Sequence, residues 1–369
     1  MKVVRNPEIK DICKTLLNAL KDPSAYTSIA LESLIETEFI HAIDAPSLAL
    51  IVPVIHRGLR DRTATTKRFG ALIAGNLVTM INDPKDFLPY VPLLIADLKA
   101  TLVDPIPDCR STAAKSLGSL TRSLGEATFP DLRPWLVDML KSDAGSSEKS
   151  GAAQGLSEVL CSGGTVMVES VLRDEILPFR SFPKAAVREG VFWVLTFLPS
   201  SLGQAFAPLI DNSFPSVIVG LSDDSEQVRD VAMRAGRIMI QVHGKAYVDK
   251  FLPSLENGMN DDDSRIRVSS LTLLGDLFNT IAGAKISKGD SDTQDDIRQA
   301  ERAQSQIALI LGSETRKRIL SSLYFRRSDS AAVVRQIAIQ VSNDVNHVNK
   351  MVLIPVFTDY VLYVSVEKC

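Results

Sequence analysis

The stretch VDPIPDCRSTAAKSLG, residues 103–118, decides the fold because its spacing recurs along the chain. In this stretch Asp104 precedes Arg110 by six residues, and small or apolar residues follow. The same acid-to-base spacing returns at Asp61 and Lys67, Asp143 and Lys149, Asp223 and Arg229, Asp261 and Arg267, and Asp329 and Arg335. Arg188 keeps the period although Phe182 stands where the acid is expected. Successive basic members are 38–43 residues apart, except the last, which follows after 68. A period of this length is typical of HEAT or armadillo helix pairs.

Each repeat is predicted to consist of two helices joined at the aspartate. Aspartate side chains accept hydrogen bonds from nearby backbone amides, which favours a turn and then a helix start. Ala113, Ala114, Leu117 and Leu120 are spaced as one buried face of the second helix. Prolines are expected near the start of the first helix, at Pro53, Pro92, Pro134, Pro215 and Pro253. We therefore predict an all-α fold, an α-α superhelix (HEAT/armadillo-type solenoid) of about seven to eight helix-pair repeats.

The domain organisation follows from where the repeat holds and where it breaks. A chain of 369 residues is too long for one compact core, which rarely exceeds about 250–300 residues. We predict a HEAT-repeat array over 1–283, a polar mobile loop over 284–306 and a further HEAT repeat over 307–341. A divergent tail with a partial helix is expected over 342–369. Neither end resembles a polar cap, so we expect the chain to be part of a longer solenoid.

Composition excludes several classes of protein. The 41 basic and 44 acidic residues nearly balance, which is not typical of a general nucleic-acid binder. The four cysteines are far apart, so neither a zinc site nor a disulfide framework is predicted and a cytosolic location is favoured: Cys13, Cys109, Cys161 and Cys369. No run of about 18 apolar residues occurs, so no membrane span is expected.

The sequence lacks three common motifs for catalysis and cofactor binding. The sole Gly-Lys pair, Gly244-Lys245, is followed by Ala246 and lacks the first glycine of a phosphate loop. No nucleophile elbow and no H-E-x-x-H motif is present. The histidines show no metal-ligand spacing: His41, His56, His243 and His347. We therefore predict no enzyme activity, no cofactor, no metal and no small-molecule substrate.

The repeated acids and bases have a structural interpretation, as a ladder of hydrogen bonds and ion pairs along the turns. Two basic clusters are candidates for contact with a ribosomal RNA backbone. The first comprises Arg57, Arg60, Arg62, Lys67 and Arg68, and the second comprises Arg316, Lys317, Arg318, Arg326 and Arg327. Each is expected to surround one inter-helix turn. A solvated surface without a partner is the alternative for both clusters.

Four stretches resemble one known family. They are FIHAIDAPSLAL (39–50), LVDPIP (102–107), SGAAQGL (150–156), and RIR (265–267) with LLGDL (273–277). They are similar to the central HEAT region of the general control nonderepressible protein one family, which are large ribosome-associated activators of the amino-acid-starvation kinase. That region is also similar to the HEAT domain of translation elongation factor three. The resemblance covers about residues 3–341, and the tail after Val341 departs from the family pattern.

The resemblance implies a cytoplasmic, ribosome-associated, non-catalytic scaffold in translational control. It implies contacts with ribosomal RNA and ribosomal proteins and with an ABC-type ATPase partner. A kinase that phosphorylates the alpha subunit of initiation factor two would be engaged through regions not in this chain. Two alternatives stay open: a nuclear transport receptor or phosphatase scaffold of the same architecture, and the HEAT part of an elongation-factor-three-type ATPase.

Overall fold

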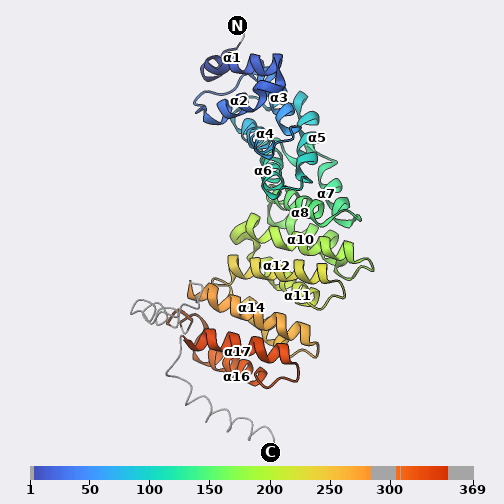
Figure 1. Cartoon of the computed structure of the whole chain (residues 1–369), viewed down its shortest axis with the longest axis vertical. Helices are drawn as coiled ribbons and strands as arrows, with labels where there is room; N and C mark the ends of the chain where they lie inside the picture. Colours follow the sequence, from blue (N-terminus) through green and yellow to red (C-terminus); the bar gives the residue numbers. More distant parts are fainter. Residues whose placement is uncertain (1–3, 284–304, 308, 348–369) are drawn as a thin grey trace, which may run out of the picture. The chain divides into compact units, whose positions relative to one another are not determined.

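The computed structural model describes residues 4–283, 305–307 and 309–347, with side chains as far as residue 343. These residues form helices and no strand; an isolated bridge joins Ile43 and Ile81. Two compact units divide the chain, Met1–Ser201 and Leu202–Cys369. Each unit is an array of helix pairs (Figure 1), which confirms the predicted all-α, HEAT-type fold.

The described residues of the first unit form five helix pairs in sequence. Their long helices are α1 (Pro7–Lys21), α2 (Pro23–Glu36), α3 (Ala45–Leu59), α4 (Ala64–Leu77), α5 (Val91–Leu102), α6 (Pro107–Leu124), α7 (Leu132–Lys141), α8 (Ser146–Leu160), α9 (Gly164–Val171) and α10 (Ala185–Leu202). Short 3-10 or π segments extend or link them: η1 (Val78–Met80), η2 (Pro84–Asp86), η3 (Leu88–Tyr90), η4 (Glu126–Thr128), η5 (Leu172–Ile176) and η6 (Leu177–Ser181).

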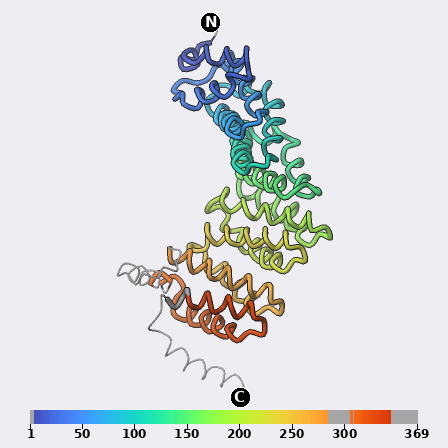
Figure 2. Tube along the Cα trace, in the orientation of Figure 1, coloured from blue at the N-terminus to red at the C-terminus, as the bar shows by residue number. Residues whose placement is uncertain are grey.

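The second unit continues the pattern. Its elements are η7 (Gly203–Leu209), α11 (Ile210–Gly220), α12 (Glu226–His243), α13 (Val248–Met259), α14 (Ser264–Ala282), α16 (Ser313–Arg326) and α17 (Ala332–His347). The second helices α12, α14 and α17 lie side by side in order, as the successive yellow, orange and red tubes of Figure 2 show.

The core lies between the stacked helices. Ala113, Ala114 and Leu117 of α6 have no exposed surface, and Leu120 has almost none, which confirms the predicted buried face. Helix α6 packs directly on α4 on one side and on α8 on the other. Gly151 of α8 permits a close approach to α5, because a β-carbon there would lie 1.8 Å from the carbonyl oxygen of Leu102. Small residues therefore let neighbouring helices approach closely.

The prolines are not all near a helix start. Pro92 and Pro134 lie in the first turns of α5 and α7 as predicted, but Pro53, Pro215 and Pro253 lie inside α3, α11 and α13. In α11 and α13 an acid, Asp211 or Asp249, occupies the first turn, where the helix dipole favours negative charge. These helices therefore begin before their proline.

Two predicted boundaries differ from those of the described helices. Of the loop expected at 284–306, residues 284–304 lie outside the described residues, whereas 305–307 are helical. The expected repeat at 307–341 contains α16 and α17, and α17 continues to His347, beyond the predicted end at Val341. The rest of the predicted tail, 348–369, lies outside the described residues.

Among the described residues, the segment Ala185–Gly220 is long and apolar enough to cross a membrane by length and composition, although no such span was expected. The segment is not one α-helix, because η7 separates α10 from α11 and Gly203 adopts a φ of +54°. More than half of the most apolar stretch of this segment is buried in the structure. Its hydrophobic composition therefore matches its packing within the helix arrays.

Candidate nucleic-acid interface

Arginines hold the turns of individual repeats. At five positions the guanidinium donates from one nitrogen to two carbonyl oxygens, those of the residues six and five positions earlier. For Arg110 these acceptors are the carbonyls of Asp104 and Pro105, at 2.9 and 2.8 Å. The other four are Arg188, Arg229, Arg267 and Arg335. The six-residue spacing thus serves a bond to the backbone, which also explains why Arg188 works without an acid at Phe182.

The aspartate carboxylates of the ladder bind the backbone amide two residues further on. The distance from the amide nitrogen to the carboxylate oxygen is 2.7–2.9 Å at each. The residues are Asp61, Asp104, Asp223, Asp261 and Asp329. In the remaining repeat Ser142 accepts from Ala144 instead, and Asp143 lies 3.2 Å from Lys184. Acid and arginine therefore both bind backbone groups of the same turn, the acid an amide and the arginine two carbonyls.

Three bases of the ladder also reach the next repeat. Lys67 donates to a carboxylate oxygen of Asp104 at 2.6 Å, and Arg267 donates to Asp329 at 3.0 Å. Burial by itself raises the pKa of Asp104, but the bonds from Lys67 and the backbone amide of Ile106 lower it below its ordinary value. The ladder thus joins neighbouring repeats as well as closing their turns.

Lys149 is the third of these bases and is fully buried. Its ammonium donates to the carbonyl oxygen of Ala186 in α10 at 2.5 Å. Burial lowers its pKa, while the charge of Glu189 opposes that shift. Such a group holds two helices together and is not available to a partner.

The first predicted cluster does surround one turn. Arg57 lies in the last turn of α3, Arg60 and Arg62 lie in the α3–α4 connection, and Lys67 and Arg68 lie in the first turns of α4. We call these five residues the basic turn. Lys67 is engaged with Asp104, so the exposed cations of the basic turn are the four arginines.

Asp97 and His56 extend this cluster and were missed by the sequence analysis. Asp97 of α5 is almost fully buried and accepts from Arg60 at 2.8 Å, while His56 lies 2.5 Å from its other oxygen. His56 and Arg60 are four residues apart, and Asp97 follows about one repeat period later. That periodic spacing is the signal that could have identified the acid.

Three arginines of the basic turn carry charge that the described part of the chain does not neutralise. Arg57, Arg62 and Arg68 are exposed, and none forms an ion pair with a described residue. Arg68 lies over the ring of Phe69 at 5.8 Å, which leaves its charge intact. These side chains are suited to an anionic surface such as a phosphate backbone.

The second predicted cluster does not surround one turn. Arg316, Lys317 and Arg318 lie in the first turns of α16, whereas Arg326 and Arg327 lie at its other end. A rise of 1.5 Å per residue separates these groups by about 15 Å. The expectation of one cluster fails because a helix, not a turn, connects them.

Most cations of α16 have partners inside the second unit. Arg318 donates to Glu256 at 3.0 Å, and Lys317 lies 3.8 Å from Glu314. Arg326 donates to Asn260 at 2.7 Å and to Asp329 at 3.1 Å. Arg327 lies over the ring of Tyr324 at 5.3 Å.

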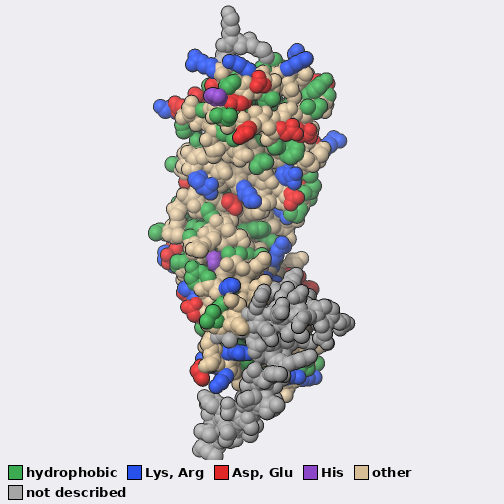
Figure 3. Space-filling model, turned by 90° about the vertical axis from the view of Figure 1, so that its left-hand side faces the viewer, with side chains coloured by type: hydrophobic (Ala, Val, Ile, Leu, Met, Phe, Trp, Pro, Cys, Tyr) green, Lys and Arg blue, Asp and Glu red, His purple; other side chains and the backbone are tan. Residues whose placement is uncertain are grey.

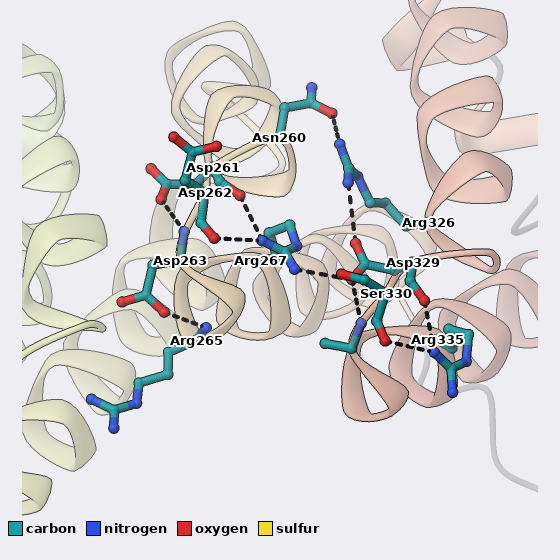
Figure 4. A network of polar contacts seen from close by, with 11 residues as sticks. Asn260, Asp261, Asp262, Asp263, Arg265, Arg267, Arg326, Asp329, Ser330 and Arg335 are labelled. Carbon is teal, nitrogen blue, oxygen red and sulfur yellow. Dashed lines mark hydrogen bonds and ion pairs between the residues drawn. The ribbon is translucent and has the colours of Figure 1, made fainter.

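Asp329 is the centre of this network, where Arg267 and Arg326 converge on one carboxylate (Figure 4). Its side chain is only 2% exposed. Burial alone raises the pKa of Asp329, but the bonds from Arg267, the amide of Ala331 and Arg326 outweigh it and lower the pKa to about 2. The carboxylate is therefore charged and structural at neutral pH.

The potential metal ligands, the Cys161 thiol and two of the histidines among the described residues do not form a reactive site. No group of three potential ligands could hold a metal ion there. Burial raises the pKa of the Cys161 thiol to about 11, so it is not a thiolate. His243 is buried against Phe206, with ring centres 5.5 Å apart, and His41 pairs with Glu8.

On the face shown in Figure 3, basic and acidic side chains are interspersed. A local contact with an anionic partner is therefore better supported than a broad basic surface.

Comparison with known proteins agrees with this architecture. Residues 25–131 match the family model "Elongation factor 3/GNC1 HEAT repeat". The chain is also similar to the crystal structure of Kap121p bound to Pho4p, with a TM-score of 0.53 and 14% identity, over 92% of this chain and 38% of that chain. At that identity the likeness concerns the fold alone.

Three relatives match over nearly the whole chain. Protein ILITYHIA of Arabidopsis thaliana is 44% identical, "eIF-2-alpha kinase activator GCN1" of Saccharomyces cerevisiae is 39% identical, and "Stalled ribosome sensor GCN1" of Homo sapiens is 41% identical. Each match covers 92% of this chain and 13% of the relative, so the chain spans a small part of their length. With its helix pairs and its elongation-factor-3-type repeats, the chain belongs to the GCN1 family.

Proposed function

We propose that this chain is a non-catalytic, ribosome-associated scaffold in translational control, acting in the cytoplasm. The observation that carries the proposal is the basic turn, where three exposed arginines lack an ion pair with any described residue. Two relatives bear the names of a stalled ribosome sensor and an eIF-2-alpha kinase activator, and those names supply the biological context. The contact would be between arginine side chains and ribosomal RNA phosphates.

The ladder contributes rigidity to this surface. Lys67 bonds to Asp104 and Arg60 bonds to buried Asp97, so the turn is fixed against the neighbouring repeat. A rigid turn loses little conformational entropy when its exposed arginines bind. Arg57, Arg62 and Arg68 would then supply the charge, while Arg60 and Lys67 hold the turn in place.

The wider role belongs to a protein much longer than this segment. We propose that the array helps this longer protein to signal ribosome stalling or amino-acid starvation to the kinase that phosphorylates the alpha subunit of initiation factor two. The kinase would be engaged through regions outside this chain. We propose an ABC-type ATPase as a further partner. This proposal is motivated by the similarity of the chain to Elongation factor 3 of Pneumocystis carinii, which is 31% identical over 135 residues.

The test is co-sedimentation with purified ribosomes across a series of salt concentrations. We expect the parent chain to bind at low salt and to lose affinity as salt rises. A triple variant, Arg57→Glu, Arg62→Glu and Arg68→Glu, should reduce the salt slope by about two and the affinity by at least about tenfold.

A matched control separates the basic turn from net charge. Lys10→Glu, Lys14→Glu and Lys21→Glu make the same charge change on exposed positions of α1. These substitutions should leave most of the affinity intact. Equal losses in both triple variants, or no binding by the parent chain at low salt, would overturn the proposed contact. ATP turnover by the purified chain would contradict the non-catalytic role.

A further inference from the structure

A groove crosses the second helices of the second unit and has no part in the proposed ribosome contact. Its volume is about 480 Å³, and residues of α12, α14 and the start of α17 line it. Leu221, Met233, Val268 and Val334 supply an apolar lining. Val333 also lines it and leaves 57% of its surface exposed. The groove thus combines an apolar interior with an accessible hydrophobic edge.

The charges that line the groove favour an anionic occupant. They are Arg229, Arg265 and Asp230, two cations against one acid. Arg229 is held by the carbonyls of Asp223 and Asp224, which fixes its position. The side chain of Arg265 extends away from the neighbouring network in Figure 4, and it forms no ion pair with any described residue. Its guanidinium is therefore available to a carboxylate.

The backbone adds to this preference. Residues Ser264 and Arg265 of α14, and Ala332 and Val333 of α17, line the groove at the amino-terminal ends of their helices. Such ends carry positive partial charge. The residue before α17 is Ala331, which has no side-chain oxygen to accept from the first amides, whereas Asp263 serves α14 in that way. An incoming carboxylate could fill that role at α17.

We infer that this groove binds a short extended peptide in which acidic and apolar side chains alternate. Packed helices lie about 9 Å apart, so crossing from α12 to α17 takes about 18 Å, which about six extended residues cover. In an extended chain alternate side chains point to opposite sides. Apolar side chains would enter the groove, while the acidic ones face Arg265 and the helix ends at its edge.

Fluorescence anisotropy with the full chain tests this inference. The probe is a fluorescein-labelled nine-residue peptide of alternating leucine and glutamate with blocked ends. Two comparison peptides replace all glutamates by lysine or all leucines by serine. We expect saturable binding of the first peptide and at least about tenfold weaker binding of the other two, which corresponds to about 1.4 kcal/mol.

Two variants locate the contact. Arg265→Glu and Val333→Glu should each weaken the binding of the leucine–glutamate peptide by at least about tenfold. Both positions are exposed, and a glutamate in the first turn of a helix is favourable, so the fold should persist. Circular dichroism melts that match the parent chain would establish this. If Val333→Glu alone failed to fold, Arg265→Glu would still decide the outcome.

The control is Arg62→Glu, which makes the same charge change in the other unit. It should leave peptide binding unchanged, and Arg265→Glu should leave ribosome binding unchanged, so the two proposals fail or stand separately. The inference is overturned if the parent chain shows no saturable binding, if the lysine peptide binds equally, or if Arg62→Glu weakens binding as much as Arg265→Glu. Competition by a single-stranded RNA at equal concentration would also overturn it, since the groove would then accept polyanions in general.

Discussion

The basic turn and the cations of α16 contain five basic residues each, yet the structure uses them differently. At the basic turn, Arg57, Arg62 and Arg68 are exposed and without ion pairs in the described chain. On α16, Arg318 and Arg326 are bound by Glu256, Asn260 and Asp329. Counting charges in sequence does not distinguish these cases, because the acids that neutralise α16 lie more than 60 residues earlier or in the next turn. Availability to a partner, and not number of cations, separates the two regions.

The largest effect should come from removing Asp329, the buried acid that Arg326 of α16 shares with Arg267. In Asp329→Ala, the guanidinium groups of Arg267 and Arg326 lose their shared partner while still largely buried. We expect a loss of about 3–5 kcal/mol in the free energy of unfolding. Urea unfolding followed by circular dichroism measures this. Asp224→Ala, an exposed position two repeats earlier, is the control and should change stability little. A small effect at Asp329 would mean that the network is not what stabilises this region.

Acid should weaken the same network with a defined direction. The pKa of Asp329 is about 2 in the folded protein and 3.8 as an ordinary aspartate. A carboxyl with a lowered folded-state pKa stabilises the protein fully above about pH 4, and that stabilisation is lost as pH falls towards 2. We expect this residue to contribute about 2 kcal/mol to the acid dependence of unfolding. Asp329→Ala should show a flatter dependence over this range, and an unchanged one would contradict the assignment.

A smaller effect is expected for one arginine of α16. Arg326→Ala removes hydrogen bonds to Asn260 and Asp329. Its side chain is mostly buried, so the loss of unfolding free energy should be about 1–2 kcal/mol. Ribosome co-sedimentation of the folded variant should be nearly unchanged. A large loss of ribosome binding with intact stability would reverse the contrast between the regions.

The smallest change in stability is expected at the basic turn. Arg62→Ala removes an exposed side chain without an ion pair in the described chain, so the free energy of unfolding should change by less than about 0.5 kcal/mol. The same substitution should measurably weaken ribosome co-sedimentation at low salt. Together with Arg326→Ala it forms a reciprocal pair, one variant affecting stability and the other binding. The contrast fails if both variants affect the same property.

Periodicity predicted the repeat architecture, because the apolar spacing around Ala113 and Leu117 is a property of neighbouring residues on one helix. It did not predict what the arginines bind, since Arg110 donates to backbone carbonyl oxygens, which have no sequence signature. The contact of Asp97 with Arg60 was missed because neither residue belongs to the repeated acid-to-base pairs, although 37 residues separate them, as 37 separate Lys67 from Asp104. The separation of the α16 cations was missed because Arg316 to Arg327 were assigned to one turn, whereas α16 extends from Ser313 to Arg326 and holds the two groups at its opposite ends.

The contact between Arg267 and Asp329 has a consequence for how the chain tolerates insertions. Lys67 reaches its partner 37 residues later, whereas Arg267 reaches its partner 62 residues later. Closing the longer span costs only about 0.5 kcal/mol more entropy, because that cost grows with the logarithm of length. The connection after α14 can therefore gain or lose sequence while the same contact forms, so new segments can be acquired there without rebuilding the array.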